Sequence, residues 1–249
     1  MLSATHIARK MHPMSKAPIV LAVDTSDLKT AIAWVKATQD SISVYKLGLE
    51  FFLTFGSDGV RAIKDETDSD IFLDLKLHDI PHTVSGATKV IADLSPKYLT
   101  VHASGGAAMI KAAVEAIPNT FITGVTVLTS LDGTDLKSIG FEKPPLETAV
   151  RLAELATASG ARAIVCSPLE ISAIRNAIGT GPVIITPGVR PAGSNKADDQ
   201  VRTMTPFDAI SSGASLVVIG RPITQSWVNG SAAMREAAAE IAAQILIKE

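Results

Sequence analysis

One short apolar segment carries two opposite charges at alternate positions. It runs Phe72-Leu73-Asp74-Leu75-Lys76-Leu77 and continues into His78-Asp79-Ile80-Pro81. Side chains alternate between the two faces of a strand, so Asp74 and Lys76 share one face while the leucines share the other. The leucine face suits packing against helices, so the two charged side chains point to the opposite side of the strand, away from those helices. Burying partly compensated charges costs on the order of several kcal/mol, so we interpret the pair as functional rather than structural.

Two later segments have the composition of an anion site. Pro187-Gly188-Val189-Arg190-Pro191 follows one apolar run, and Gly220-Arg221-Pro222 follows the next. A glycine before a helix start exposes backbone N–H groups toward an anion, and an arginine adds a permanently charged fork that matches a phosphate. We therefore expect a phosphate group to bind beside these two segments.

The segments that position these residues alternate between strand-like and helix-like patterns. Short β-branched runs are each followed by a stretch rich in Ala, Leu, Lys and Glu, which indicates parallel strands joined by helices. We expect strands over 19–23, 44–47, 71–75, 98–101, 121–127, 163–165, 183–185 and 216–219, and helices near 27–39, 57–66, 82–94, 105–117, 145–159, 168–178, 206–212 and 231–247. Eight such units in 249 residues predict an α/β fold, a single (β/α)8 TIM barrel.

An open, doubly wound sheet is the alternative architecture. Its Gly-x-Gly-x-x-Gly turn is missing after the first run, where Asp24-Thr25-Ser26-Asp27 stands instead. The strand runs are apolar throughout, which predicts strands covered on both faces. We therefore expect residues 17–249 to form one barrel domain and residues 1–16 to form a disordered N-terminal extension.

In such a barrel, the reacting groups lie at the carboxyl ends of the strands. Polar residues follow nearly every run at this point: Asp24, Lys46, Asp74, Lys76, Asp79, His102, Thr129 with Ser130, Gly188 with Arg190, and Gly220 with Arg221. Charges that all face one mouth are hard to explain as solvated caps. The polar stretch from Pro191 to Gln200 is long for a loop in a compact domain, and we interpret it as a lid over the substrate.

The composition excludes several classes of partner. The net charge is −2, and no Lys/Arg run is long enough to follow a phosphate backbone, so we expect no nucleic-acid partner. No apolar run approaches the length of a membrane span, so we expect no membrane partner. The single cysteine, Cys166, ends an apolar run, which indicates a buried side chain in a protein of the reducing cytoplasm.

Three histidines near the expected mouth, His78, His82 and His102, are candidate metal ligands together with Asp74. Their spacing matches no recognised metal-ligand motif. We therefore expect no metal and interpret them as hydrogen-bonded structural histidines.

Taken together, these motifs resemble the orotidine 5′-phosphate decarboxylase family, in order from about Pro18 to the last helix. The Asp-x-Lys-x-x-Asp core is shared with sugar-phosphate relatives, whereas the last two strand motifs and Gln200 make the resemblance specific. His82 departs from it, because many relatives carry a small polar residue there. The segments that carry the resemblance are Asp24, Tyr45-Lys46-Leu47-Gly48, Asp74 to Pro81, Val101 to Gly106, Leu128-Thr129-Ser130, Pro187 to Pro191 and Ile219 to Thr224.

The resemblance implies decarboxylation of orotidine 5′-monophosphate to uridine 5′-monophosphate in pyrimidine biosynthesis, with no cofactor. It implies a homodimer in which Lys46, Asp74 and Lys76 come from one subunit and Asp79 from the other, with Lys76 as the proton donor. It also implies binding roles: Asp24 and Lys46 for the ribose, Thr129 or Ser130 for the pyrimidine, Gln200 for base and phosphate, and Gly220, Arg221 and Arg190 for the phosphate.

Two other functions are compatible with these residues. One is a metal-assisted sugar-phosphate aldolase or decarboxylase of the same superfamily, which a chelator would inactivate. The other is a non-catalytic binder of a phosphorylated ligand, since a barrel scaffold does not fix function. A lysine between two carboxylates argues against the binder, because binding alone does not need a buried proton donor.

Overall fold

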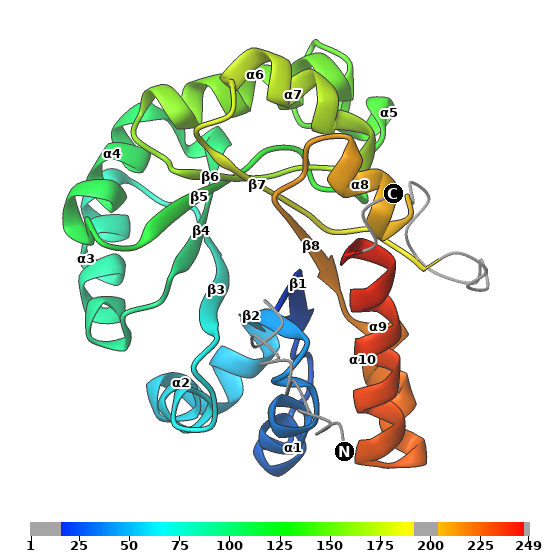
Figure 1. The fold of residues 1–249 in the computed structure, drawn as a ribbon. Coiled ribbons are helices and arrows are strands. Elements are labelled where there is room, and N and C mark those ends of the chain that lie inside the picture. Colours follow the sequence, from blue (N-terminus) through cyan, green and yellow to red (C-terminus); the bar gives the residue numbers. More distant parts are fainter. Residues whose placement is uncertain (1–15, 192–203, 247–249) are drawn as a thin grey trace, which may run out of the picture.

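The structure is a computed structural model that describes residues 16–191 and 204–246. In these ranges, eight parallel strands form a closed barrel in sequence order (Figure 1). The expected (β/α)8 barrel is therefore confirmed and the open sheet is wrong. The strands are β1 (Ala17–Ala22), β2 (Ile42–Gly48), β3 (Asp70–Leu77), β4 (Tyr98–His102), β5 (Phe121–Val125), β6 (Ala163–Val165), β7 (Val183–Thr186) and β8 (Leu216–Ile219).

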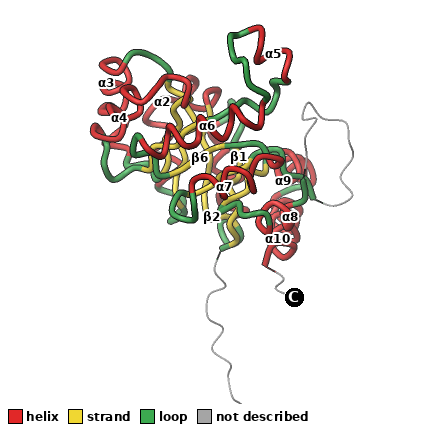
Figure 2. The backbone as a smooth tube through the Cα atoms, turned by 90° about the horizontal axis from the view of Figure 1, so that it is seen from above, coloured by secondary structure: helices red, strands yellow, loops and turns green. Residues whose placement is uncertain are grey.

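Helices surround the barrel and cover the outer face of its strands (Figure 1). α5 is an exception, because it stands out from the ring in Figure 2. No helix in the described ranges has the length and apolarity that crossing a membrane requires. The helices are α1 (Leu28–Thr38), α2 (Leu49–Lys64), α3 (Pro81–Ile91), α4 (Gly106–Ala116), α5 (Gly133–Ser138), α6 (Pro145–Ala158), α7 (Ile171–Ile178), α8 (Pro206–Ser211), α9 (Arg221–Thr224) and α10 (Ser231–Leu246), with short 3-10 turns η1 (Ala92–Leu94), η2 (Ala103–Gly105), η3 (Pro168–Glu170) and η4 (Gln225–Asn229).

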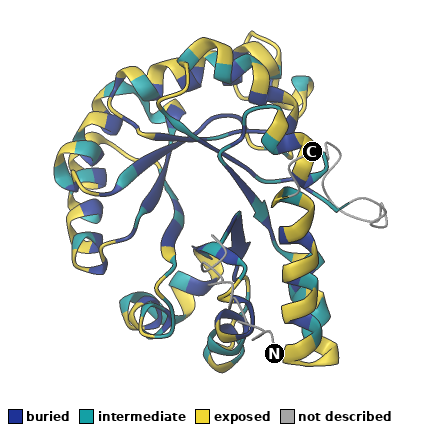
Figure 3. Cartoon of the chain, viewed as in Figure 1, coloured by how far each residue is buried: buried dark blue, intermediate teal, exposed yellow. Residues whose placement is uncertain are grey.

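The strands are buried on both faces, as their continuous apolar runs predict (Figure 3). The larger apolar cluster fills the space between strands and helices. The smaller one lies inside the barrel and includes Val44, Phe72 and Tyr98. Edge-to-face contacts join Phe72 to Tyr98 and Tyr98 to Phe121, each with ring centroids 5.6 Å apart. This inner cluster closes the barrel below its mouth and forms the floor on which the site rests.

Several expected boundaries are wrong, and backbone geometry explains the largest error. α2 begins at Leu49 rather than near residue 57, and it is kinked at Gly56, where φ is 57°. This left-handed glycine interrupts the helical pattern on which the expectation relied. β5 ends at Val125 rather than at residue 127, and α5, α9 and η4 were not anticipated. The expected N-terminal extension lies outside the described residues except for Lys16, and so does most of the expected lid.

Candidate active site

A cavity of about 190 Å³ opens at the carboxyl end of the barrel. Its wall combines three charged side chains, Lys46, Asp74 and Lys76, with apolar groups from β5, β6 and β8. Lys46 and Asp74 come directly above the inner apolar cluster, because Val44 and Phe72 precede them by two positions on the same strand face. The strand pleat therefore directs these charges inward, as the alternation of the sequence predicts.

Asp74 lies between the two lysines. Its Oδ1 accepts a hydrogen bond from Lys76 Nζ at 2.8 Å, and its Oδ2 lies 3.6 Å from Lys46 Nζ. Lys46 Nζ also contacts Asp24 Oδ1 at 3.3 Å. The Asp74 side chain is 14% exposed, whereas that of Asp24 is 60% exposed. The result is an alternating row of charges that runs from the solvent-exposed Asp24 to Lys76 inside the mouth.

The charges around Asp74 decide its protonation state. Burial would raise the pKa of Asp74, but the charges of Lys46 and Lys76 and the hydrogen bonds from Lys76 and Thr100 outweigh burial, so the pKa lies below its usual value. Asp74 is therefore ionised at neutral pH. The row therefore alternates in sign, with Lys46 between two carboxylates and Asp74 between two ammonium groups, so groups of either charge on a ligand can find an opposite partner in it.

The backbone at Lys76 is unusual. Its φ is 47°, the left-handed region that non-glycine residues rarely adopt. β3 also loses its regular pairing with β4 here, since Leu73 pairs with Leu99 but Leu77 pairs with Val101. Strained backbone of this kind is concentrated at functional sites. Lys76 lies in the cavity wall, on the face that regular alternation along the strand predicts. The strand itself, however, is not regular at this residue.

Thr100 is a site residue that the sequence analysis missed. It is fully buried in β4, its hydroxyl accepts a hydrogen bond from the backbone N–H of Lys76 at 2.8 Å, and it donates to Asp74 Oδ1 at 3.0 Å. The available signal was a polar residue at an inward position of the apolar run Tyr98-Leu99-Thr100-Val101.

The remaining expected residues divide into two groups. Thr129 lines the cavity, and its competitor Ser130 is not in the lining. Arg190, Gly220 and Arg221 are not in the lining either, but they shortly follow Pro187 and Val218, which are. Gln200 lies outside the described residues, so its expected role has no structural description.

Asp79 is not brought together with the lysines. Its carboxylate accepts a hydrogen bond from the backbone N–H of Ile80 at 2.7 Å. Among the described residues, no ion pair joins Asp79 to either Lys46 or Lys76. Asp79 is exposed, and the neighbouring Ile80 is 65% exposed although it is apolar.

The histidines and the cysteine show no reactive arrangement. The rings of His78 and His102 lie 5.3 Å apart. No hydrogen bond joins the side chain of His78, His82 or His102 to another described residue, so the hydrogen bonds expected for these histidines are not found in the described ranges. Burial and the charges of His78 and Lys76 lower the pKa of His102. Within the described ranges, no group of three His, Cys, Asp or Glu side chains is placed to hold a metal ion. Cys166 is buried as expected, and burial raises the pKa of its thiol to about 12, so it remains protonated.

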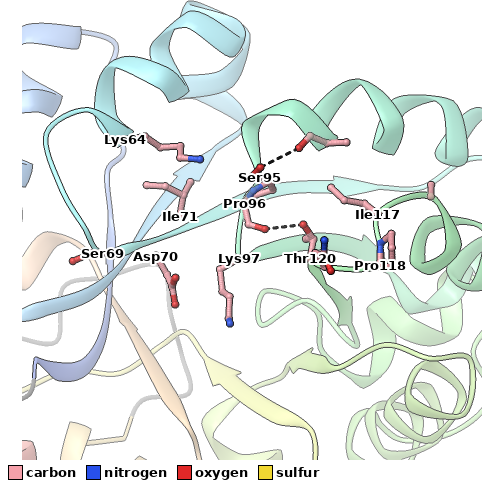
Figure 4. A pocket seen from close by; sticks show the side chains of 13 residues that line it. Lys64, Ser69, Asp70, Ile71, Ser95, Pro96, Lys97, Ile117, Pro118 and Thr120 are labelled. Carbon is pink, nitrogen blue, oxygen red and sulfur yellow. Dashed lines mark hydrogen bonds between the residues drawn. The ribbon is translucent and has the colours of Figure 1, made fainter.

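A second cavity, of about 380 Å³, lies at the opposite end of the barrel, between the starts of β3, β4 and β5 (Figure 4). Several of its polar side chains have partners within the chain. Lys64 Nζ donates to the carbonyl oxygen of Leu94 at 2.6 Å, and the Thr120 hydroxyl donates to that of Pro96 at 2.7 Å. Lys97 lies over the ring of Phe121. These contacts stabilise the base of the barrel, so the smaller cavity is the better candidate for chemistry.

Comparisons with known proteins agree on one family. Residues 17–237 match the model of the "Orotidine 5'-phosphate decarboxylase / HUMPS family". The chain is 50% identical over 222 residues to the orotidine 5′-phosphate decarboxylase of Thermobifida fusca (strain YX), covering 89% of this chain and 95% of that protein. It is 45% identical over 243 residues to that of Frankia casuarinae (strain DSM 45818 / CECT 9043 / HFP020203 / CcI3), covering 91% and 88%. The solved structure of the Lactobacillus acidophilus enzyme has a TM-score of 0.79 at 31% identity, covering 93% of this chain and 100% of that chain.

The ion pairs of Asp74 predict a pH-dependent contribution to stability. Because its pKa is lowered in the folded chain, Asp74 stabilises the fold at pH values above its unfolded pKa, and this contribution is lost as pH falls through the folded pKa. Each unit of lowering corresponds to about 1.4 kcal/mol. Asp74→Asn should therefore reduce the free energy of unfolding most at neutral pH and progressively less in acid.

Urea unfolding of the parent and of Asp74→Asn between pH 7 and the acid limit of the folded state measures this difference. Asp93→Asn is the matched control, since it removes an exposed carboxylate from η1, outside the site. A difference between Asp74→Asn and the parent that stays constant over the whole range would contradict the assignment of a lowered pKa.

Proposed function

Because the chain belongs to the orotidine 5′-phosphate decarboxylase / HUMPS family, we propose that its Lys46–Asp74–Lys76 cluster carries out the reaction without a cofactor or a metal. The chain is an enzyme, a carboxy-lyase, and its similarity to orotidine 5′-phosphate decarboxylases indicates that it decarboxylates orotidine 5′-monophosphate in pyrimidine biosynthesis. The observation that carries the residue-level proposal is the hydrogen bond of 2.8 Å between Lys76 Nζ and Asp74 in the wall of the cavity.

Lys76 is the proposed proton donor. When the bond between C6 of the pyrimidine and the carboxylate breaks, CO2 leaves and an electron pair remains on C6. No adjacent group in the ring accepts this charge, so a fixed ammonium is needed to stabilise it. The Lys76 ammonium provides this electrostatic stabilisation and then transfers its proton to C6, which yields uridine 5′-monophosphate.

Asp74 is proposed to face the carboxylate of the substrate. Its lowered pKa supports this role, because the group must be ionised to act on the substrate charge. Two unit charges about 4 Å apart repel by about 4 kcal/mol at an effective dielectric of about 20. This repulsion raises the free energy of the bound substrate and is relieved when CO2 leaves.

The other side chains at the mouth are proposed to hold the substrate in place. Binding energy from groups remote from C6 aligns the reacting atoms. The exposed Asp24 beside Lys46 supports a shared contact with the ribose hydroxyls. The proposed contacts are Asp24 and Lys46 with the ribose, Thr129 with the pyrimidine edge, Gln200 with base and phosphate, and Gly220, Arg221 and Arg190 with the phosphate.

Lys76→Ala should decrease kcat by at least about a thousandfold, because both charge stabilisation and the proton are lost. It should still bind uridine 5′-monophosphate, since the main task of the lysine lies in the transition state. Loss of the orotidine absorbance gives kcat, and calorimetry gives product binding.

Lys111→Ala removes the same side chain from an exposed position on α4 and should keep the parental kcat. If Lys76→Ala kept a kcat within tenfold of the parent, Lys76 would not be the proton donor.

We further propose a cytoplasmic homodimer in which each site receives Asp79 from the partner subunit. Asp79 lies beyond the end of β3 and, among the described residues, forms no ion pair with Lys46 or Lys76 of its own chain. It sits in an exposed segment that runs into Ile80 and Pro81, and an exposed Ile80 is better explained by a surface that a second chain covers. A two-fold dimer would bring this segment of each chain to the other.

Mixed dimers test the shared site. Lys76→Ala and Asp79→Ala homodimers should each be nearly inactive. After joint unfolding and refolding in equal amounts, about half of the dimers should be mixed, and each mixed dimer should contain one site with both defects and one with none. About a quarter of all sites should then regain parental turnover.

Mass measurement of the mixed dimers is the control for their formation. If mixed dimers form and turnover is not restored, Asp79 acts within its own chain, because every site then keeps one defect.

A further inference from the structure

The pairing register between β3 and β4 shifts next to the Lys46–Asp74–Lys76 cluster. Leu73 pairs with Leu99 and Leu77 pairs with Val101, so three residues of β3, Asp74 to Lys76, lie opposite the single residue Thr100. Regular parallel pairing would give one residue opposite each of them. The extra residues must form a bulge in β3. The left-handed φ of 47° at Lys76 is the backbone distortion that accommodates this bulge.

A bulge leaves backbone groups without ladder partners, and a buried N–H without a partner is costly. The backbone N–H of Lys76 is satisfied by the side chain of Thr100 rather than by a carbonyl of β4, with N to Oγ1 2.8 Å. The threonine hydroxyl therefore takes the place of the missing ladder bond. An aliphatic residue at this position would leave the N–H without that partner.

The same hydroxyl also fixes the carboxylate of Asp74. Because Oγ1 accepts from the Lys76 N–H, its own proton is available to donate, and it lies 3.0 Å from Asp74 Oδ1. This Oδ1 is also the atom that accepts from Lys76 Nζ. One buried hydroxyl thus connects the backbone of the proposed proton donor with the carboxylate that orients its ammonium.

We propose that Thr100 is a positioning residue for the decarboxylation, which holds the bulged backbone of Lys76 and the carboxylate of Asp74 in register with each other. The proposal rests on the proposed function of the Lys46–Asp74–Lys76 cluster. Thr100 is fully buried and is not in the lining of the cavity, so it acts through these two residues and does not contact the substrate.

A neighbouring threonine provides a matched comparison. Thr123 on β5 is directly opposite Thr100 in the strand pairing and is also fully buried. Its hydroxyl donates to the carbonyl oxygen of Phe121 at 2.9 Å. The two residues share type, burial and strand position, and they differ in that only Thr100 is hydrogen-bonded to the charge cluster.

Thr100→Val keeps the shape of the side chain and removes the hydroxyl, while Thr100→Ser keeps the hydroxyl. Thr100→Val should decrease kcat by at least about tenfold, the size expected for losing a hydrogen bond to a charged group. Its affinity for uridine 5′-monophosphate should change less than its kcat, because the phosphate and ribose contacts remain. Thr100→Ser should restore kcat to within threefold of the parent, and Thr123→Val should stay within threefold of it.

A kcat of Thr100→Val within threefold of the parent, or a Thr100→Ser variant as slow as Thr100→Val, would overturn the proposal. If Thr100→Val does not fold, the pair Thr100→Ser and Thr100→Ala replaces it, since these variants differ by one oxygen atom. Equal kcat values for this pair would also overturn the proposal.

The parental assay separates this proposal from the proposed function. If the parent does not decarboxylate orotidine 5′-monophosphate, the proposed function fails by itself, and the crystal structure of the Thr100→Val variant (or of Thr100→Ala) then tests the positioning claim. Departure of Lys76 from positive φ, or rotation of the Asp74 carboxylate, would support the claim. An unchanged backbone and carboxylate would overturn it.

Discussion

The carboxylate of Asp74 lies between the ammonium groups of Lys46 and Lys76, and the chemistry of the barrel mouth depends on this contact. Its side chain is only 14% exposed, so it could not remain ionised without compensation. Lys76 at 2.8 Å and Lys46 at 3.6 Å provide that compensation and lower its pKa. The same contact fixes where the Lys76 ammonium points. Pairing and orientation therefore come from one arrangement of three side chains.

This arrangement requires a backbone that a regular barrel strand does not have. A left-handed residue such as Lys76 costs about 1–3 kcal/mol, and such strain persists only where the surroundings determine it. Below it, the inner cluster of Phe72 and Tyr98 fixes the start of the bulge. Beside it, Thr100 satisfies the freed N–H. The rigid floor and the buried hydroxyl together hold a strained segment in one conformation, which is what a preorganised charge site needs.

The barrel and the identity of most charged residues could be predicted from sequence, because both follow from local patterns. Eight apolar runs, each followed by a helical stretch, are a repeated local signal, and Asp74 and Lys76 share a face by the period of the strand alone. The register shift between β3 and β4 could not be predicted, because it depends on how two separate segments pair. Thr100 was missed for this reason, since a threonine in an apolar run is otherwise an ordinary strand residue. Among the described residues, Asp79 forms no ion pair with Lys46 or Lys76, and a role supplied from a partner subunit cannot be derived from patterns within one chain.

The most direct test of the account is the rate of decarboxylation of orotidine 5′-monophosphate before and after exhaustive chelation. Lys76 is proposed to provide charge stabilisation and the proton, whereas a metal ion would stabilise the charge in the alternative sugar-phosphate chemistry. We therefore expect the chelated enzyme to keep the parental rate and added Mg²⁺ not to increase that rate. Loss of activity on chelation, followed by recovery with Mg²⁺, would contradict it.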